Sequence, residues 1–359
     1  MQNLFVYKYA VLFAFALFLS VLLNTIFLKF SRNLGRRDQD DSIVRWSSIS
    51  KPSLGGISFY IIFLVTYSVY TIFFNRITDL LNIQHIGILV SASMAFLMGL
   101  SDDAYNTNPL LKFLVQVACG AVLFLTGTYI SLFANPLFDF IITVLWVVAV
   151  MNSINMLDNM DAITTTVSIF IIFSAMSAAW VSPSFDHFFM TSMVGVCGAL
   201  IGFLFYNWNP SKMFMGDTGS QFLGIFLASM GIIFFWNNNG LETEEAASKQ
   251  LTITILAFIV PIVDTATVII NRLRRGSSPF VGGKDHTTHN LSYLGLSDKS
   301  VARVFAMISF VSYLLIYIIV NNFKEWSYLN AACFLSYFVV VFGVLYYITR
   351  LPQNLKKLQ

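Results

Sequence analysis

The sequence predicts an all-α integral membrane protein with about eleven membrane-spanning helices. Its 359 residues are 57% hydrophobic and only 11% charged, whereas a soluble domain has roughly a quarter of its residues charged. An apolar stretch of about 20 residues crosses the hydrocarbon core as a helix, so about eleven such stretches use roughly 220 residues. Only short loops remain, and we therefore expect one membrane-embedded domain over residues 1–359.

Apolar runs separated by short polar loops define the expected helices. They cover residues 9–30, 54–75, 85–101, 111–130, 138–154, 164–181, 187–206, 220–236, 251–271, 302–321 and 329–348. The first run is too long for the core of a cleavable signal peptide and lacks a small-residue cleavage site. We interpret it as a retained first helix.

The positive charges predict how these helices are oriented. If successive helices alternate in direction, one side of the membrane receives 17 of the 21 Lys and Arg residues. The other side receives only Lys8, Arg76, Lys249 and Lys324. Lys and Arg in short loops favour the cytoplasm, so we expect the N-terminus outside and the C-terminus in the cytoplasm.

Composition also limits the partners. A net charge of +3 is too small to indicate nucleic-acid binding, and the lipid bilayer is the expected environment. Cys119, Cys197 and Cys333 all lie in apolar runs, which favours buried hydrophobic residues over a disulfide or a metal site.

Acids, amides and histidines gather on the predicted cytoplasmic side, in four loops that are distant in sequence. They are Asp102, Asp103, Asn152, Asn155, Asp158, Asp161, Asp217, Asp285, His286 and His289. Carboxylates at the ends of membrane helices are costly unless water, a cation or another partner receives them. A hard divalent ion such as Mg²⁺, which prefers carboxylate, amide and phosphate oxygens, would offset their mutual repulsion.

The first of these loops pairs Asp102 with Asp103 at the end of the third expected helix, and Lys112 opens the fourth. Adjacent carboxylates hold a cation or divide into a base and a supporting group. A solvated helix end is an equally good interpretation of this loop alone.

The second loop places Asn152, Asn155, Asp158 and Asp161 at a strict spacing of three. Side chains three apart are neighbours on an α-helix, and on a 3₁₀ turn all four share one face. Their oxygens therefore line up where the fifth helix emerges, although chance spacing in a polar loop produces the same pattern.

The two remaining loops combine small residues with ionisable ones. Gly216 and Gly219 surround Asp217, which suits close approach of a ligand or an ordinary helix start. His286 and His289 lie three apart near glycines, which suggests contacts to phosphate or sugar rather than zinc. Asp264, three residues after Pro261, either orients basic groups nearer the cytoplasm or has a purely structural role.

Taken together, these loops resemble the polyprenyl-phosphate N-acetylhexosamine-1-phosphate transferase family, also called glycosyltransferase family 4. The resemblance runs from KPSLGG at residues 51–56 to HTTHNLSYLGLS at residues 286–297. Between them, SDDAYNTNPLLK, NSINMLDNMD and FMGDTGS occur in the order and at the spacing of the family. The ordered set is far more specific than any one of these strings.

The resemblance implies a Mg²⁺-dependent enzyme, with Mn²⁺ as an alternative ion. Such an enzyme transfers a sugar 1-phosphate from a UDP-N-acetylhexosamine to undecaprenyl phosphate and releases UMP. It implies a bacterial inner membrane location, with the active site facing the cytoplasm, and leaves a homodimer open. A membrane-surface site is required in any case, because one substrate is soluble and the other is a lipid.

The resemblance also implies roles for individual residues. Asp217 would bind the metal with help from Asn155, and Lys112 would neutralise phosphate charge. Asp102 and Asp103 would act at the lipid phosphate, with Asp102 activating it as the nucleophile. Asp158 and Asp161 would support the metal site and the uridine, and His286 and His289 would contact the phosphates or the sugar. Asn152 belongs to the expected substrate-binding set.

Three positions depart from the family pattern. Ala162 replaces a glycine that many members have, and Thr288 and Asn290 replace a histidine and an arginine of the H-I-H-H-R loop. The triple histidine of the muramoyl-pentapeptide branch is also absent. With about eleven helices instead of ten, this favours a GlcNAc-like donor, and a product that starts a lipid-linked O-antigen, capsule, teichoic acid or similar cell-surface polysaccharide.

Three alternatives remain at this point. One is the phospho-N-acetylmuramoyl-pentapeptide transferase of peptidoglycan synthesis, which differs in its donor. Another is a family member that has lost catalysis, which the departures at Ala162, Thr288 and Asn290 permit. The third is a secondary transporter, which the one-sided acids and the lack of a visible repeat disfavour.

Overall fold

The computed structural model describes residues 2–33, 51–73, 82–133, 135–182, 185–237, 244–278 and 282–351. Arg36, Arg37, Arg45, Arg76, Lys356 and Lys357, which contribute to the predicted charge asymmetry, lie outside these ranges. Within the described part of the chain the secondary structure is helical, with one isolated β-bridge between Ser53 and Phe214.

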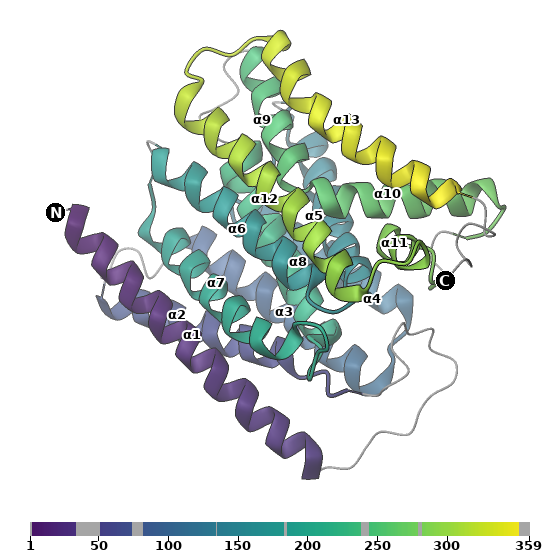
Figure 1. Cartoon of the computed structure of the whole chain (residues 1–359). Coiled ribbons are helices and arrows are strands. Elements are labelled where there is room, and N and C mark those ends of the chain that lie inside the picture. Colours follow the sequence, from purple (N-terminus) through teal and green to yellow (C-terminus); the bar gives the residue numbers. More distant parts are fainter. Residues whose placement is uncertain are drawn as a thin grey trace.

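The elements follow one another along the chain as a series of helices (Figure 1). Those before the centre of the sequence are α1 (Gln2–Asn33), α2 (Gly55–Phe73), α3 (Ile83–Tyr105), α4 (Pro109–Leu125), α5 (Pro136–Leu157) and α6 (Ile163–Val181). Those after it are α7 (His187–Asn207), α8 (Gly216–Gly231), the π-helix η2 (Ile232–Trp236), α9 (Glu244–Ala257), α10 (Ile259–Arg274), α11 (Thr287–Tyr293), α12 (Asp298–Asn322) and α13 (Tyr328–Arg350).

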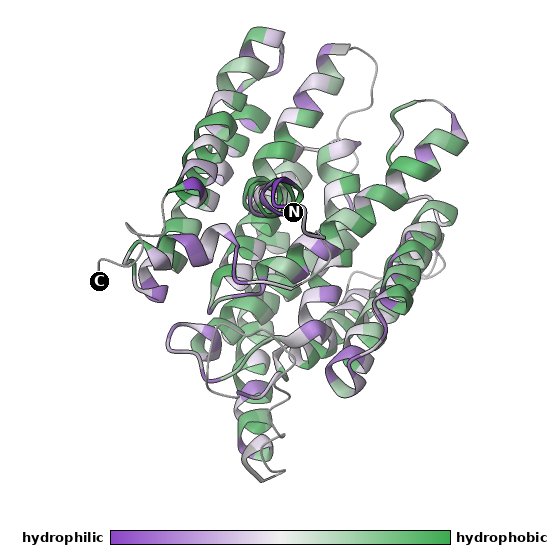
Figure 2. Ribbon diagram, turned by 90° about the vertical axis from the view of Figure 1, so that its right-hand side faces the viewer, coloured by the Kyte–Doolittle hydropathy of each residue, from purple (hydrophilic) through white to green (hydrophobic). Residues whose placement is uncertain are grey.

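Nine helices in the described residues are long and apolar enough to cross a membrane, and the pair α9 and α10 raises this to ten if it is one span. This agrees with a polytopic membrane protein, and hydrophobic residues dominate the helices (Figure 2). The remaining expected span, residues 111–130, corresponds to α4, a shorter apolar helix of 17 residues.

The ninth expected span is not one straight helix. It divides into α9 and α10, which meet at an angle of 77°, and Figure 1 shows α10 running across the direction of its neighbours. The break follows Ala257, and Pro261 lies in the first turn of α10. A proline is tolerated there because the first N–H groups of a helix have no partner within it.

The centre of the protein is formed by α8, which packs against α3 and α5. Together with η2 it forms a span that is 94% buried, whereas the spans formed by α1 and α13 are only 22% and 17% buried. Figure 1 shows α1 and α13 along opposite edges of the molecule. The outer helices therefore present apolar side chains to lipid. The functional site is expected at the polar ends of the inner helices.

Candidate functional site

Four of the predicted site residues meet where α3 ends, α4 begins, α5 ends and α8 begins. The ammonium of Lys112 donates to Asp102 Oδ2 at 2.9 Å and to Asp217 Oδ1 at 3.3 Å. It also lies 3.5 Å from Asn155 Oδ1. We call Asp102, Lys112, Asn155 and Asp217 the Lys112 cluster. It brings together residues from four different helices around one positive charge.

Asp102 is tied both to this cluster and to the loop after α3. Its second oxygen accepts hydrogen bonds from the backbone N–H of Thr107 at 2.9 Å and from the Thr107 hydroxyl at 2.6 Å. Asn106 ends the helix in the left-handed conformation, with φ of 50°, which Asn tolerates better than most residues. The loop therefore fixes Asp102 with one carboxylate oxygen directed at Lys112.

Asp103 has a different place, at the N-terminus of α8. Its carboxylate accepts from the backbone N–H groups of Asp217 and Thr218 at 3.1 and 2.9 Å, and from the Thr218 hydroxyl at 2.6 Å. A carboxylate suits this position because the first N–H groups of a helix are unpaired and carry positive partial charge. Asp103 thus holds the turn that presents Asp217.

Gly216 is required by the same turn. Its φ of 73° is in the left-handed region, and a Cβ atom there would lie 2.6 Å from Asp103 Oδ2. Any other residue would both strain the backbone and displace the carboxylate. This glycine matters because it places the backbone against Asp103.

Asp217 and Asn155 are in direct contact. The amide of Asn155 donates to Asp217 Oδ1 and, at 2.8 Å, to the hydroxyl of Ser220. Asn155 lies in the last turn of α5 and Ser220 in the first turns of α8. The amide therefore joins the two helices at the level of the cluster.

The KPSLGG segment braces the Asp217 turn from the other side. Ser53 bridges in parallel to Phe214, and the N–H groups of Gly55 and Gly56 donate to the carbonyls of Phe214 and Met215 at 3.1 and 3.0 Å. A Cβ atom on Gly56 would collide with the backbone of Gly219. This motif therefore supports the loop before α8.

Asp161 forms a separate group near the loop after α7. It accepts from Ser211 N at 3.0 Å, from Ser211 Oγ at 2.7 Å and from Asn209 Nδ2 at 3.1 Å. Lys51 Nζ lies 3.7 Å from Asp161 and donates to Ser211 Oγ at 2.9 Å. Asp161 therefore lies beside the Lys112 cluster rather than within it. We call Asp161, Ser211 and Lys51 the loop clamp.

Asp158 caps the C-terminus of α5, and the charges of neighbouring acids change its pKa. Burial, together with the charges of Asp217, Asp103 and Asp161, raises the pKa of Asp158 to about 8. A carboxylate with such a pKa is protonated near neutral pH unless a cation joins it. The electrostatics at the end of α5 therefore favour a bound positive charge.

The histidine loop is anchored by Asp264, which is 1% exposed. Asp264 Oδ2 lies 2.7 Å from His286 Nδ1, and Asp264 Oδ1 accepts from the backbone N–H and hydroxyl of Thr287 at 2.8 and 2.6 Å. Of the two sequence-based interpretations, the contact with His286 favours the one in which Asp264 orients basic groups. His286 and His289 pack edge to face, with ring centroids 5.4 Å apart.

Two of the departures from the family pattern have structural roles in this loop. The Thr288 hydroxyl donates to Asn159 Oδ1 at 2.8 Å, which ties α11 to the loop after α5. The Asn290 amide donates to the backbone carbonyls of His286 and Asp285 at 2.8 and 3.3 Å. Thr288 therefore holds the loop against the segment that follows α5, and Asn290 stabilises the backbone of the loop itself.

A basic pair lies beside the loop, at the end of α10. Arg272 makes two hydrogen bonds to Asp285, of 3.0 and 2.7 Å, and Arg275 makes a third of 2.7 Å. Burial disfavours the ionised carboxylate, but the hydrogen bonds and charge of Arg272 outweigh it, so the pKa of Asp285 is below its usual range. Arg275 remains 55% exposed at its side chain.

Asn152 lies one turn deeper than Asn155, and it is linked to two glutamines that the sequence reasoning missed, to Gln116 directly and to Gln221 through Gln116. It exchanges hydrogen bonds with Gln116, and Gln116 also donates to Gln221 Oε1 at 3.1 Å. Both glutamines are fully buried. Glutamines inside apolar runs were the available signal, because a buried amide in a membrane helix needs a partner.

The oxygen donors at the Lys112 cluster suit a hard cation in part. Asp217, Asn155 and Asp102 supply carboxylate and amide oxygens, and they already surround the ammonium of Lys112. Among the described residues there is no group of three or more His, Cys, Asp or Glu side chains arranged to hold a metal. The set therefore fits Mg²⁺ in the form that uses one or two carboxylates and takes its other ligands from substrate phosphates and water.

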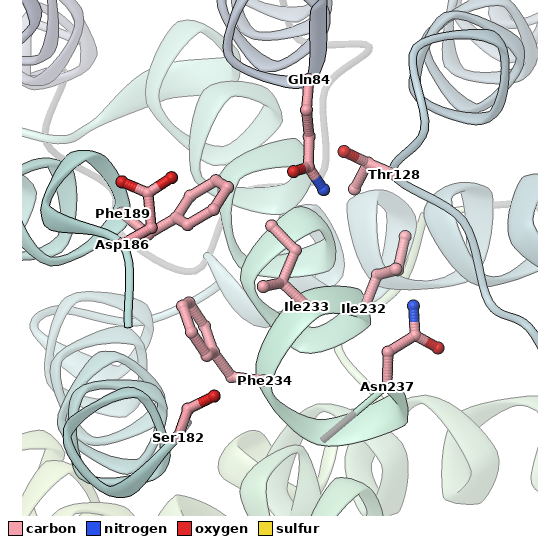
Figure 3. A pocket seen from close by; sticks show the side chains of 9 residues that line it. All are labelled: Gln84, Thr128, Ser182, Asp186, Phe189, Ile232, Ile233, Phe234 and Asn237. Carbon is pink, nitrogen blue, oxygen red and sulfur yellow. The ribbon is translucent and has the colours of Figure 1, made fainter. Parts of the chain in front are cut away.

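A cavity of about 340 Å³ lies at the opposite ends of these helices (Figure 3). Gln84 at the start of α3 lines it, together with Asp186 and Asn237. Asp102 lies near the other end of the same helix. This cavity is thus separate from the Lys112 cluster.

Comparison with known proteins places this arrangement in a family. Residues 85–235 match the model for glycosyl transferase family 4. The chain is 30% identical over 233 residues to the probable undecaprenyl-phosphate N-acetylglucosaminyl 1-phosphate transferase of Bacillus subtilis (strain 168). This alignment covers 62% of the chain and 63% of the relative.

Two further relatives carry different names. The phospho-N-acetylmuramoyl-pentapeptide-transferase of Staphylococcus haemolyticus is 31% identical over 245 residues, 61% of this chain and 69% of that protein. The decaprenyl-phosphate N-acetylglucosaminephosphotransferase of Mycobacterium leprae is 27% identical over 238 residues, 60% of this chain and 59% of that protein. The chain thus matches about three-fifths of the length of the Bacillus and Mycobacterium relatives. The match spans α3 to η2, which includes every member of the Lys112 cluster, and the chain belongs to glycosyl transferase family 4.

Proposed function

We propose that this protein transfers N-acetylhexosamine 1-phosphate, most simply GlcNAc 1-phosphate, from a UDP-sugar to undecaprenyl phosphate and releases UMP. The observation that carries the proposal is the Lys112 ammonium held between Asp102 and Asp217 and beside Asn155. Such a group suits two phosphate-bearing substrates that must approach each other against their mutual repulsion.

The reaction forms one bond and breaks one. An oxygen of the lipid phosphate attacks the sugar-bearing phosphorus of the donor, and the bond to the bridging oxygen breaks as UMP leaves. Asp102 accepts the proton when the lipid phosphate arrives as a monoanion, and Lys112 neutralises charge on the phosphates. A bound Mg²⁺ would offset phosphate charge and be held by Asp217 and Asn155.

The other predicted residues have supporting roles in this reaction. Asp103 keeps Asp217 in position through the start of α8, and Asp158 would support the metal site and the uridine. Asp161 holds the loop after α7 and would support the uridine. His286 and His289 would approach the phosphates or the sugar, with His286 oriented by Asp264.

The position of the cluster agrees with the nature of the substrates. It lies at the ends of apolar helices, where a lipid headgroup and a soluble nucleotide can meet. The positive charges predict that this end faces the cytoplasm of a bacterium. The product would then initiate a cell-surface polysaccharide.

A second candidate is transfer of phospho-N-acetylmuramoyl-pentapeptide. The Staphylococcus haemolyticus relative, at 31% identity, favours it about as strongly as the Bacillus relative favours GlcNAc 1-phosphate. Absence of the triple histidine from the loop after α10 favours the first candidate. The two candidates differ in the donor that the protein uses.

The test is release of UMP by the purified protein with undecaprenyl phosphate, MgCl₂ and one donor at a time. We expect turnover with UDP-GlcNAc and little with UDP-MurNAc-pentapeptide, and the reverse preference would establish the second candidate. Release of no UMP from any UDP-N-acetylhexosamine, with either Mg²⁺ or Mn²⁺, contradicts the proposal.

Asp217→Asn is the sharpest variant for the metal assignment. The change preserves shape but removes the charge, and we expect kcat to fall by about 100-fold or more, as when a key electrostatic group is lost. Ser336→Ala, on an exposed face of α13, is the matched control and should retain activity. Unchanged turnover in Asp217→Asn, or undiminished turnover in excess EDTA, would show that the metal assignment is wrong.

A further inference from the structure

Three buried amides form a layer directly beneath the Lys112 cluster. They are Gln116 on α4, Asn152 on α5 and Gln221 on α8. Gln116 Nε2 donates to Asn152 Oδ1 at 3.3 Å and to Gln221 Oε1 at 3.1 Å, and Asn152 Nδ2 returns a bond of 2.8 Å to Gln116 Oε1. We call these three side chains the amide layer.

Each member lies one helical turn below a residue of the cluster. Gln116 follows Lys112 by four positions, Gln221 follows Asp217 by four, and Asn152 precedes Asn155 by three. Residues at these spacings lie on the same face of a helix. Because α4 and α8 begin at the site and α5 ends there, all three amides lie on the inner side of the cluster.

The layer therefore fixes the three helices relative to one another. A slide or rotation of any helix would break its amide contacts, and a buried amide left unpaired among apolar residues is costly. Buried polar residues are best attested in such a role, where they set the register between helices. The depth and rotation of Lys112, Asn155 and Asp217 follow from it.

Gln221 shows that the layer is not simply the most stable filling of this space. Its side chain is fully buried, with an exposed fraction of 0%. Gln221 Nε2 has no hydrogen-bond partner among the described residues. An unpaired buried donor destabilises a protein, and an apolar residue of similar shape would remove that cost. Stability alone does not account for an amide here.

We infer that the amide layer of Gln116, Asn152 and Gln221 is a positioning element of the site, which holds Lys112, Asn155 and Asp217 in register and leaves the Gln221 amide as a donor for an oxygen ligand. This inference rests on the proposed function for its catalytic consequence. Its effect on cation binding rests on the proposed metal assignment to Asp217 and Asn155.

The experiment measures Mn²⁺ affinity by electron paramagnetic resonance, the thermal unfolding midpoint, and UMP release in the full-length protein. For Gln221→Leu we expect Mn²⁺ binding to weaken about five-fold, in line with the loss of an interhelical polar contact. The unfolding midpoint should stay unchanged or rise. With UDP-GlcNAc, kcat should fall and KM should change little.

Two further variants separate positioning from folding. The double variant Gln116→Leu with Gln221→Leu makes the layer largely apolar, and we expect a stable protein with the same weak Mn²⁺ binding. Ser229→Ala, on α8 but two to three turns deeper, removes a hydroxyl that bonds only within its own helix and is the matched control. It should match the wild type in all three measurements.

Wild-type Mn²⁺ affinity and kcat in Gln221→Leu would overturn the inference. So would losses that merely follow a lower unfolding midpoint, and so would a wild type that binds no Mn²⁺. If the wild type binds Mn²⁺ but releases no UMP from any donor, the proposed function fails while the layer is still judged by Mn²⁺ affinity.

Discussion

Ala162 occupies a backbone conformation that favours glycine. Its φ of 67° lies in the left-handed region, where it precedes α6 and donates its N–H to Asn207 Oδ1 at 3.1 Å. A non-glycine residue costs about 1–2 kcal/mol in this region, and part of this is offset by the smaller entropy loss of alanine. The departure from the family pattern thus costs stability without touching the Lys112 cluster.

We expect Ala162→Gly to raise the free energy of unfolding by up to about 1 kcal/mol. The thermal unfolding midpoint of the purified protein is the measurement, and UMP release should be unchanged. Ala332→Gly, in the exposed helical part of α13, is the matched control and should lower stability, because glycine weakens a helix interior. A midpoint for Ala162→Gly that falls as it does in the control would refute this account.

His289 is held in its neutral form. Burial and the charge of His286 lower its pKa to about 4. Because the folded-state pKa is below the unfolded value of about 6.5, the contribution of His289 to stability is fully present above that value and is lost as pH falls toward 4. At neutral pH the ring is a hydrogen-bonding group without a charge.

We therefore expect the wild-type unfolding midpoint to fall between pH 7 and pH 5, and His289→Gln to show a shallower fall. The wild type and the variant should share the same pH dependence of kcat/KM between pH 6 and 8, since His289 does not titrate there. Equal slopes of midpoint against pH in the two proteins would mean that this histidine is not the group responsible.

Much of the site could be predicted residue by residue. Asp102, Lys112, Asn155 and Asp217 were all recognisable, because charged and amide residues at the ends of apolar runs must meet a partner. Gln116 and Gln221 were missed, since a neutral amide scarcely lowers the hydropathy of its run. The separation of Asp161 from the cluster was also not predictable, because it depends on Ser211 and Lys51, which are distant in sequence.

At the scale of elements, α8 depends on a carboxylate supplied by another helix. Asp103, near the end of α3, accepts three hydrogen bonds from the start of α8, whereas Asp102 faces Lys112. Two adjacent residues of the same type thus act on different elements. The sequence indicated the pair but not this division.

This division predicts different outcomes for two similar variants. Asp103→Asn should lower both the unfolding midpoint and UMP release, because the amide has only one acceptor oxygen where Asp103 uses two and lacks the negative charge that favours a helix N-terminus by about 0.3–1 kcal/mol. Asp102→Asn should lower UMP release with a much smaller effect on the midpoint, because Lys112 keeps Asp217 as a partner. If the two variants change stability equally, the separate assignment is wrong.

The helices themselves were largely predictable, but their breaks were not. Each expected apolar run overlaps a helix in the described residues, although α4 ends at Leu125, before the end of its run at residue 130. A hydropathy window averages over the junction at Phe258 and so misses the 77° bend between α9 and α10, although Pro261 was a local sign of it. The short helix α11 was hidden because its order comes from contacts of Thr287 with Asp264 and of Thr288 with Asn159.

At the scale of the whole molecule, the distribution of charge and burial divides the protein into two ends. The Lys112 cluster, the loop clamp at Asp161 and the basic pair at the end of α10 all belong to one end. The cavity near Gln84 and Asp186 belongs to the other. Since Lys and Arg favour the cytoplasm, the first end should be cytoplasmic.

Labelling in intact bacterial cells tests this orientation directly. Lys299 and Glu325 are exposed residues near opposite ends of α12, and Lys299 lies at the end that carries the histidine loop. We expect a membrane-impermeant thiol reagent to label Glu325→Cys from outside and to label Lys299→Cys only after permeabilisation. Because α12 is one continuous helix of 25 residues, long enough to cross the hydrocarbon core, the two positions must face different compartments. Labelling of Lys299→Cys in intact cells would therefore place the Lys112 cluster outside, where no UDP-sugar is supplied, and would remove the proposed reaction along with the orientation.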